Sequence, residues 1–142
     1  MVWGPFFKGD ILAIEKVQRR ATKMVSRLND LKYEERLQAL NLPSLSHRRR
    51  RGDMIYAYKL ITGKINMDKD KFFKISHLST RGHEQKIYKE HAIKLPRINT
   101  FSNRGVRDWN NLTSEIVTAV STNAFKNKLD NYWKDMIYDT PF

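Results

Sequence analysis

The chain has 142 residues, of which 40% are hydrophobic and 30% charged, and its 27 Lys and Arg against 15 Asp and Glu give a net charge of +12. This length suits one domain with its own core, the absence of cysteine excludes disulfides and thiolate metal sites, and no apolar run approaches the roughly 18 residues of a membrane span. A charge excess of this size indicates a polyanionic partner.

Residues 10–28 have the pattern of a helix, with Asp10 as the expected N-cap. Apolar residues recur there every three or four positions, the helical period. They are Ile11, Ile14, Val17, Ala21, Met24, Val25 and Leu28, and we expect Ile14, Val17, Ala21, Met24 and Leu28 to be buried. A basic row of the same period, about 16 Å long, lies on roughly the opposite side of the helix. Its members are Lys16, Arg20, Lys23 and Arg27, with Arg19 beside them.

Two further helices are expected in the first half of the chain. The first spans 31–40 and is ended by Pro43. The second begins near Ser44, runs to about residue 62, and is stopped by Gly63.

The second of these helices carries four successive arginines, Arg48, Arg49, Arg50 and Arg51. They cannot share one face, because neighbouring residues on a helix are about 100° apart. We therefore expect Arg48 or Arg51 to lie near the packing side or to pair with an acid. The acids that we expect to serve are Asp53, Glu34 and Glu35.

In the second half of the chain the sequence predicts loops followed by further helices. Residues 85–96 alternate in part between apolar and polar, which predicts at most a small hairpin. Helices are expected at 101–110 and 122–136. The first should bury Phe101, Val106 and Trp109, and the second, capped by Ser121, should bury Phe125, Leu129 and Trp133. The expected fold is thus mainly α, a small helical domain with a basic helical part at 10–62, a loop and hairpin region at 63–100, and C-terminal helices at 101–137.

The order of the motifs resembles a known family. These motifs are Trp3-Gly4-Pro5, EKVQRRATK (15–23), YEERLQALNLPSL (33–45), RRRRGDMIYAYKLITG (48–63), TRGH (80–83), FSNRGVRDWNNL (101–112) and STNAFKNKLD (121–130). Together they resemble the region downstream of the polymerase core in reverse transcriptases of non-LTR retrotransposons, of the jockey-like and chicken-repeat-like kind. In that family the region follows the palm and acts as, or includes, the thumb, which grips the template–primer duplex. The resemblance implies that residues 1–142 are a single thumb-like helical domain, a fragment of an RNA-directed DNA polymerase.

The catalytic motifs of such a polymerase are missing from this sequence. It lacks the Tyr/Phe-Ala-Asp-Asp loop, whose carboxylates hold two metal ions together with an earlier aspartate. The near-paired acids, Glu34-Glu35 and Asp68/Asp70, lie in helical or lysine-rich surface contexts. We therefore expect no catalytic residue, metal site, cofactor or small-molecule substrate, so that this chain is not itself an enzyme. The N-terminal MVWGPFFKGDIL lacks the pattern of a signal peptide, and we expect an intracellular protein whose basic clusters favour the nucleus.

The leading functional hypothesis is a domain that binds the backbone of an RNA–DNA or DNA duplex. The phosphate-contacting residues would be Lys16, Arg19, Arg20, Lys23, Arg27, Arg48, Arg49, Arg50 and Arg51. The missing palm would be a second partner, and no membrane is expected. Two alternatives stay open. The chain could be a basic helical protein–protein interaction module, or a non-functional decayed fragment that does not fold alone.

Overall fold

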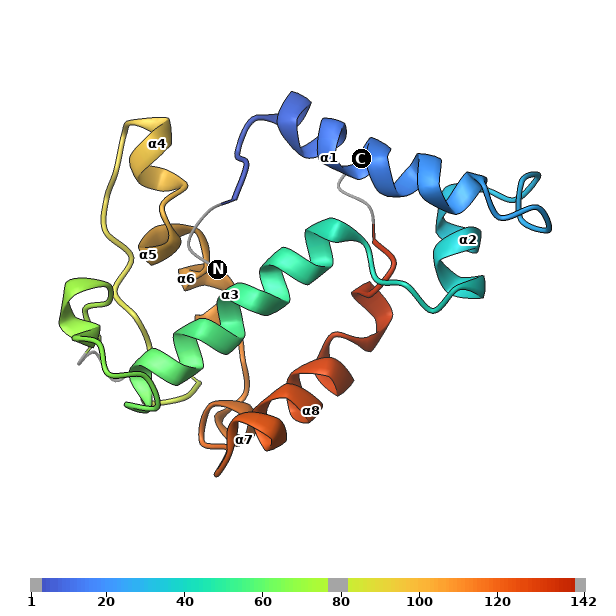
Figure 1. Cartoon of the computed structure of the whole chain (residues 1–142). Coiled ribbons are helices and arrows are strands. Elements are labelled where there is room, and N and C mark those ends of the chain that lie inside the picture. The colour runs from blue at the N-terminus through green and yellow to red at the C-terminus, as the bar shows by residue number, and fades with distance from the viewer. Residues whose placement is uncertain (1–3, 77–81, 140–142) are drawn as a thin grey trace. The chain divides into compact units, whose positions relative to one another are not determined.

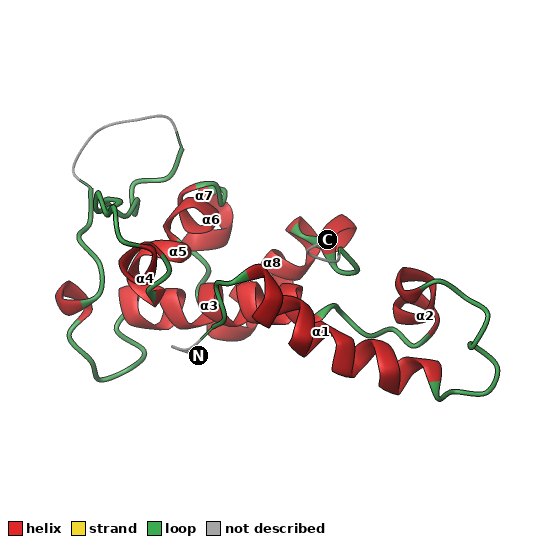
Figure 2. Cartoon of the chain, turned by 90° about the horizontal axis from the view of Figure 1, so that it is seen from above, coloured by secondary structure: helices red, strands yellow, loops and turns green. Residues whose placement is uncertain are grey.

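Helices dominate the computed structural model, which describes residues 4–76 and 82–139. The helices are α1 (Lys8–Lys23), α2 (Tyr33–Ala39), α3 (Leu45–Ile61), α4 (Leu95–Ile98), α5 (Phe101–Arg104), α6 (Val106–Asn110), α7 (Ser114–Val117) and α8 (Thr122–Tyr132), with 3-10 turns η1 (Lys69–Lys71) and η2 (Lys134–Met136). Figure 2 shows helices and loops throughout the described part of the chain, without an arrow. The expected mainly α-helical fold is confirmed.

The described residues form two compact units. Residues 51–76 and 82–132 make up the first, here called the Trp109 unit, and residues 4–50 with 133–139 make up the second, the α1 unit. The boundary along the chain falls within α3, after Arg50, and again before η2.

The two ends of α3 and the start of α8 lie at residues that the sequence indicated. Ser44 precedes α3, and its Oγ accepts the amide of His47 at 3.2 Å. Gly63 ends the same helix with φ +68°. Its amide donates to Leu60 O (3.2 Å) and the next amide, of Lys64, to Lys59 O (2.8 Å), the two bonds of a Schellman motif. Ser121 Oγ accepts the amide of Ala124 at 3.1 Å and caps α8. These three predictions are confirmed.

Aromatic and aliphatic side chains from α3 and from α5 to α8 build the core of the Trp109 unit. Trp109 is fully buried, and its indole N–H donates to Gln85 O at 2.8 Å. Tyr58 stacks on Phe125 with ring centroids 4.3 Å apart. The predicted burial of apolar side chains in the C-terminal helices is confirmed. These side chains are Phe101, Val106, Trp109, Phe125 and Leu129 in this unit, and Trp133 in the α1 unit.

Two predictions for this unit are corrected in detail. The pairing expected within 85–96 is instead one antiparallel bridge between Ile75 and Ile87. The N–H and C=O of Ile87 point away from the segment of Ile75. They bond to the Asn110 side chain, at 2.8 and 2.9 Å, and not to another strand. The single helix expected at 101–110 is two short ones, α5 and α6, with Gly105 between them. A Cβ at Gly105 would lie 3.0 Å from Met54 Cε, so the backbone there packs directly against the Met54 side chain of α3.

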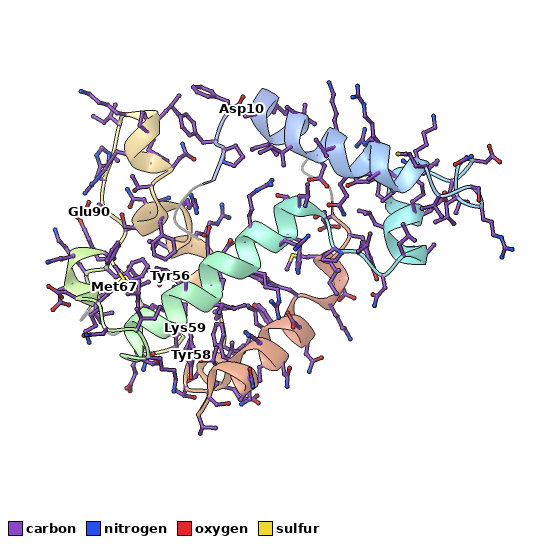
Figure 3. All side chains as sticks on the ribbon, in the orientation of Figure 1. Asp10, Tyr56, Tyr58, Lys59, Met67 and Glu90 are labelled. Carbon is purple, nitrogen blue, oxygen red and sulfur yellow. The ribbon has the colours of Figure 1, made fainter. Side chains whose placement is uncertain are left out.

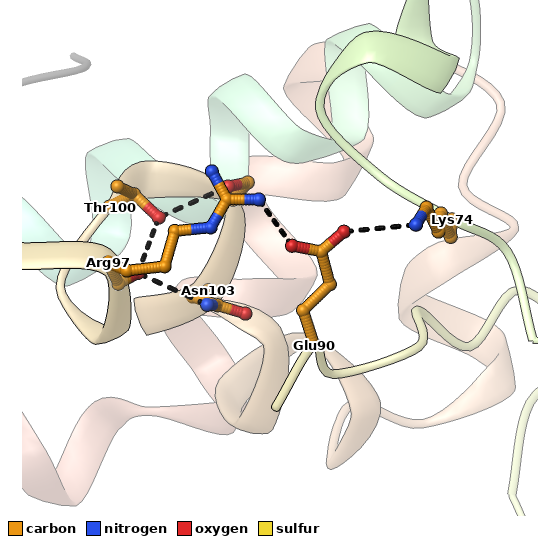
Figure 4. A network of polar contacts seen from close by, with 6 residues as sticks. Lys74, Glu90, Arg97, Thr100 and Asn103 are labelled. Atoms are coloured by element: carbon orange, nitrogen blue, oxygen red, sulfur yellow. Dashed lines mark hydrogen bonds and ion pairs between the residues drawn. The ribbon is translucent and has the colours of Figure 1, made fainter. Parts of the chain in front are cut away.

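An exposed polar network joins the segment before α4 to its surroundings in the same unit (Figure 4). The carboxylate of Glu90 bonds Arg97 on one oxygen and Lys74, at 3.1 Å, on the other. Hydrogen bonds from both cations lower the pKa of Glu90, with Arg97 the larger cause. Thr100 and Asn103 both donate to the carbonyl of Arg97. The network fixes α4 against the start of α5.

The expected face and end of the first helix are both wrong. The helix begins at Lys8, with Phe7 rather than Asp10 at its N-cap, and ends at Lys23. Of the apolar stripe predicted to be buried, Val17 is 68% exposed and Met24 85% exposed, and Ala21 is exposed as well. The buried positions of α1 are instead the polar residues Glu15 and Thr22. The buried face of α1 is therefore rotated about the helix axis relative to the predicted face. Hydrogen bonds from α2 to Glu15 and Thr22 account for this rotation.

Candidate nucleic-acid interface

A buried polar network sets the orientation of α1. Glu15 Oε1 accepts the hydroxyl of Tyr33 on α2 at 2.7 Å and the amide of Leu45, the first residue of α3, at 3.3 Å. Gln18 donates to Pro43 O at 3.0 Å. Burial and the hydrogen bond to Glu15 raise the pKa of Tyr33, so its hydroxyl keeps its proton and remains a donor. The middle of α1 is thereby tied both to α2 and to the start of α3.

A second part of the network closes the turn between α1 and α2 (Figure 1). The guanidinium of Arg36, which is only 5% exposed, donates to Thr22 Oγ1 at 3.2 Å and to Leu31 O at 2.5 Å. Arg36 thus joins the end of α1, at Thr22, to the segment just before α2, at Leu31. A buried cation is stable only when its N–H groups are hydrogen-bonded, and these bonds meet that need. The buried residues of α1 are consequently polar, because Tyr33 bonds to Glu15 and Arg36 bonds to Thr22.

With Glu15 and Thr22 inside, the basic row lies outside. Lys16, Arg20 and Lys23 are all exposed, and none forms an ion pair with a residue that the structure describes. They occupy about 10 Å of helix length at steps of four and three residues. Beyond the first turn, the one acid on α1 is Glu15, which is buried. The exposed surface of α1 beyond its first turn is thus positive without an acid of its own.

The two remaining basic residues of this segment differ from the row. Arg19 is exposed, but its guanidinium lies 4.8 Å from the centre of the Tyr33 ring, a cation–π contact. Arg27 is also exposed, but it follows the end of α1 and does not continue the row on the helix. Figure 3 shows nitrogen-tipped side chains standing out from α1. The row expected on a single helix over 16–27 therefore extends over 16–23.

The four arginines of α3 are in different surroundings. Arg48 and Arg50 are exposed, and Arg50 lies 5.1 Å from the centre of the Trp133 ring. Arg49 is half-buried and has a partner of its own. Arg51 makes a bidentate ion pair with Asp130 of α8, at 2.5 and 2.8 Å, and this hydrogen bonding raises its pKa. Arg51 thus pairs with an acid, as expected for Arg48 or Arg51, but its partner is Asp130 and not the expected Asp53, Glu34 or Glu35.

Asp53 has a different partner, which the sequence did not suggest. Its two oxygens accept Nε and Nη2 of Arg104 at 2.7 and 2.8 Å, and this pair ties α3 to α5 within the Trp109 unit. No local spacing could indicate it, because the two residues are 51 positions apart.

Two of the four near-paired acids, Glu35 and Asp68, accept backbone amides at the start of short helical segments. Glu35 Oε2 accepts the Lys32 amide at 2.7 Å, ahead of α2, and Asp68 Oδ1 accepts the Asp70 amide at 3.0 Å, at η1. Within residues 4–76 and 82–139 no three acidic or histidine side chains cluster as a metal site would require. Two histidines of the described part are buried, His47 against Trp133 and His83 against Trp109. Burial lowers the pKa of His83.

Comparisons with known proteins found no similar protein. No family model matches the chain, and no match to it was found among curated proteins or solved structures. Among the described residues, no helix combines the length and the apolar character that crossing a membrane requires.

Proposed function

We propose that this chain is a nucleic-acid-binding, thumb-like fragment of a retrotransposon reverse transcriptase, without a catalytic site of its own. The observation that carries the proposal is the exposed basic row of Lys16, Arg20 and Lys23, which no acid on the outer side of α1 neutralises. The family resemblance of the sequence supports the same conclusion. A net charge of +12 adds attraction for polyanions over a longer range.

The geometry of the row suits phosphates. Helical residues three or four positions apart have Cβ atoms about 5–6 Å apart, and long basic side chains at this spacing can each reach a different phosphate. Contacts of this kind fix a duplex in place without reading its sequence. Arg48 and Arg50, both exposed, would add contacts from the start of α3. Arg51 would not, because its guanidinium is engaged by Asp130.

The proposal also covers the chemistry that the chain does not perform. The purified chain should not extend a primer on an RNA template with Mg²⁺ or Mn²⁺ present, because its sequence lacks the Tyr/Phe-Ala-Asp-Asp loop whose carboxylates hold the metal ions of a polymerase. Incorporation of nucleotides above background by the purified chain would contradict this part of the proposal.

Binding to labelled duplexes tests the interface itself. Fluorescence anisotropy would compare two DNA duplexes of unrelated sequence and an RNA–DNA hybrid, with the parent chain and the Arg20→Ala/Lys23→Ala variant. Each phosphate contact contributes about 0.9 to the dependence of log K on log salt, so losing two should weaken binding about 60-fold at ~0.1 M salt. The loss should be equal for all three duplexes, because backbone contacts carry no sequence information.

The matched control is Lys69→Ala/Lys71→Ala, which removes two exposed cations from η1 and lowers the net charge equally. It should change the affinity much less. Equal losses in the two double variants would mean that only net charge matters. No duplex binding by the folded parent chain at ~50 mM salt would contradict the proposal altogether.

A further inference from the structure

A second row lies on the outside of α1 beside the basic one, and it is apolar. Val17 and Met24 are 68% and 85% exposed, and Ala13 and Ala21 are exposed as well. Positions 13, 17, 21 and 24 follow the helical spacing, so these side chains form a continuous stripe about 16 Å long. The stripe exists because the polar contacts of Glu15 and Thr22 turned this face of α1 away from α2.

The apolar stripe and the basic row adjoin along their whole length. Arg20 is three positions after Val17 and four before Met24, so it neighbours both on the helix surface. A partner that covers this face must therefore bury apolar atoms and meet positive charge at the same time. The charges decide between the possible occupants.

A second copy of the chain fits poorly, because its own basic row would approach Lys16, Arg20 and Lys23, and like charges repel. A nucleic acid satisfies the cations but leaves Val17 and Met24 in water. A membrane surface would gain little from a stripe of two alanines, one valine and one methionine, because peripheral helices insert Trp, Phe or Leu. A helix with an apolar stripe flanked by Asp or Glu matches both rows, through the helix-in-groove and opposite-charge pairing that protein interfaces use.

We infer that the exposed face of α1 docks an acidic amphipathic helix of a protein partner. Apolar side chains of the partner cover Val17 and Met24, and its carboxylates pair with Lys16, Arg20 and Lys23. This goes beyond the proposed function, but it uses the same cations, so the partner and a nucleic acid exclude each other from this face. The partner would thus displace the chain from a duplex.

A synthetic peptide of about 18 residues, with leucine at helical spacing and glutamate beside it, serves as the probe. Its control has the same composition in a scrambled order without an apolar stripe. Titration calorimetry should show saturable binding of the amphipathic peptide to the parent chain and much weaker binding of the scrambled one. Addition of the amphipathic peptide should also release a labelled duplex from the parent chain.

Variants separate the two rows. Val17→Gln/Met24→Gln should weaken peptide binding at least about tenfold, since two apolar side chains would no longer be available for burial against the peptide. The same variant should leave duplex binding unchanged. Glutamine favours helices and both positions are exposed, so the fold should persist. The matched control, Ile93→Gln/Val120→Gln, removes two side chains of similar exposure, 85% and 89%, and should bind the peptide normally.

Each outcome decides between the proposals. Equal binding of the amphipathic and scrambled peptides, or undiminished binding by Val17→Gln/Met24→Gln, would overturn the docking inference. Vesicles of phosphatidylserine and phosphatidylcholine test the membrane. If Val17→Gln/Met24→Gln lowers vesicle binding but not peptide binding, the occupant is a lipid surface and the inference is wrong. Peptide binding without any duplex binding would overturn the proposed function and leave the docking inference standing.

Discussion

Two ion pairs of the Trp109 unit have nearly the same geometry but should contribute very differently to its stability. Arg104–Asp53 and Arg51–Asp130 are both bidentate, with distances of 2.7 and 2.8 Å and of 2.5 and 2.8 Å. They differ in their exposure to water. The Asp53 and Arg104 side chains are 8% and 21% exposed, whereas those of Arg51 and Asp130 are 33% and 41% exposed.

Exposure determines the cost of breaking each pair. Replacing Asp53 by asparagine removes the carboxylate that faces the Arg104 guanidinium in a largely dry site, which should cost about 3 kcal/mol of the free energy of unfolding. Replacing Asp130 by asparagine leaves Arg51 in contact with water, and the loss should be at most about 1 kcal/mol. Because both pairs lie in the same unit, the same unfolding transition reports on both variants.

Urea unfolding followed by circular dichroism at 222 nm measures the difference. With a denaturant slope of about 1.5 kcal/mol/M, Asp53→Asn should lower the midpoint by about 2 M and Asp130→Asn by less than about 0.7 M. Equal shifts, or a larger shift for Asp130→Asn, would refute the argument that burial decides the energetic value of these pairs.

Three further substitutions should change the free energy of unfolding, two of them in opposite directions and the third in its dependence on pH. Gly63→Ala should destabilise the fold by about 1 kcal/mol in the same urea assay, since φ +68° at the end of α3 disfavours any side chain. Gly52→Ala, inside α3 with nothing within 4 Å of the new Cβ, should instead stabilise it by about 0.5–1 kcal/mol, and destabilisation by Gly52→Ala would show that α3 is strained there. Burial lowers the pKa of His83 below its unfolded value, which is near 6.5. Below about pH 6.5 the unfolded chain therefore binds a proton that the folded chain does not. The free energy of unfolding should fall as the pH falls through this range. His83→Gln should remove this part of the pH dependence, and an unchanged pH profile in that variant would contradict the assignment.

Much of the fold could be predicted because its signals are local. Ser44, Gly63 and Ser121 each act through bonds to backbone groups within a few residues, and the structure confirms all three. The apolar period of α8 was a similar signal, with Phe125 and Leu129 both fully buried. Caps and periods of this kind need no knowledge of a distant partner.

The failures concern contacts between distant residues. The period of α1 pointed to Val17 and Met24 as buried, but it could not show that Tyr33 and Arg36 would reach Glu15 and Thr22. Hydrogen bonds of buried polar groups outweighed the apolar stripe in setting the rotation of that helix.

Ion-pair partners were also beyond local reasoning, since Arg51 and Asp130 are 79 positions apart. The exposure of Lys16, Arg20 and Lys23 was expected and is confirmed, but for a reason that the sequence did not supply. Their contact with phosphates stays a prediction.

The salt dependence of duplex binding tests the central claim, that the basic row of α1 holds phosphates, most directly. If Lys16, Arg20 and Lys23 each neutralise one phosphate, they contribute about −3 to the slope of log K against log salt. With the contacts of Arg48 and Arg50 added, the slope for the parent chain should lie between about −3 and −4.5. Arg20→Ala/Lys23→Ala should flatten the slope by about 2, and Lys69→Ala/Lys71→Ala should leave it nearly unchanged. A slope for Arg20→Ala/Lys23→Ala equal to that of the parent would contradict the claim, because the cations of α1 would then be no more than a solvated face.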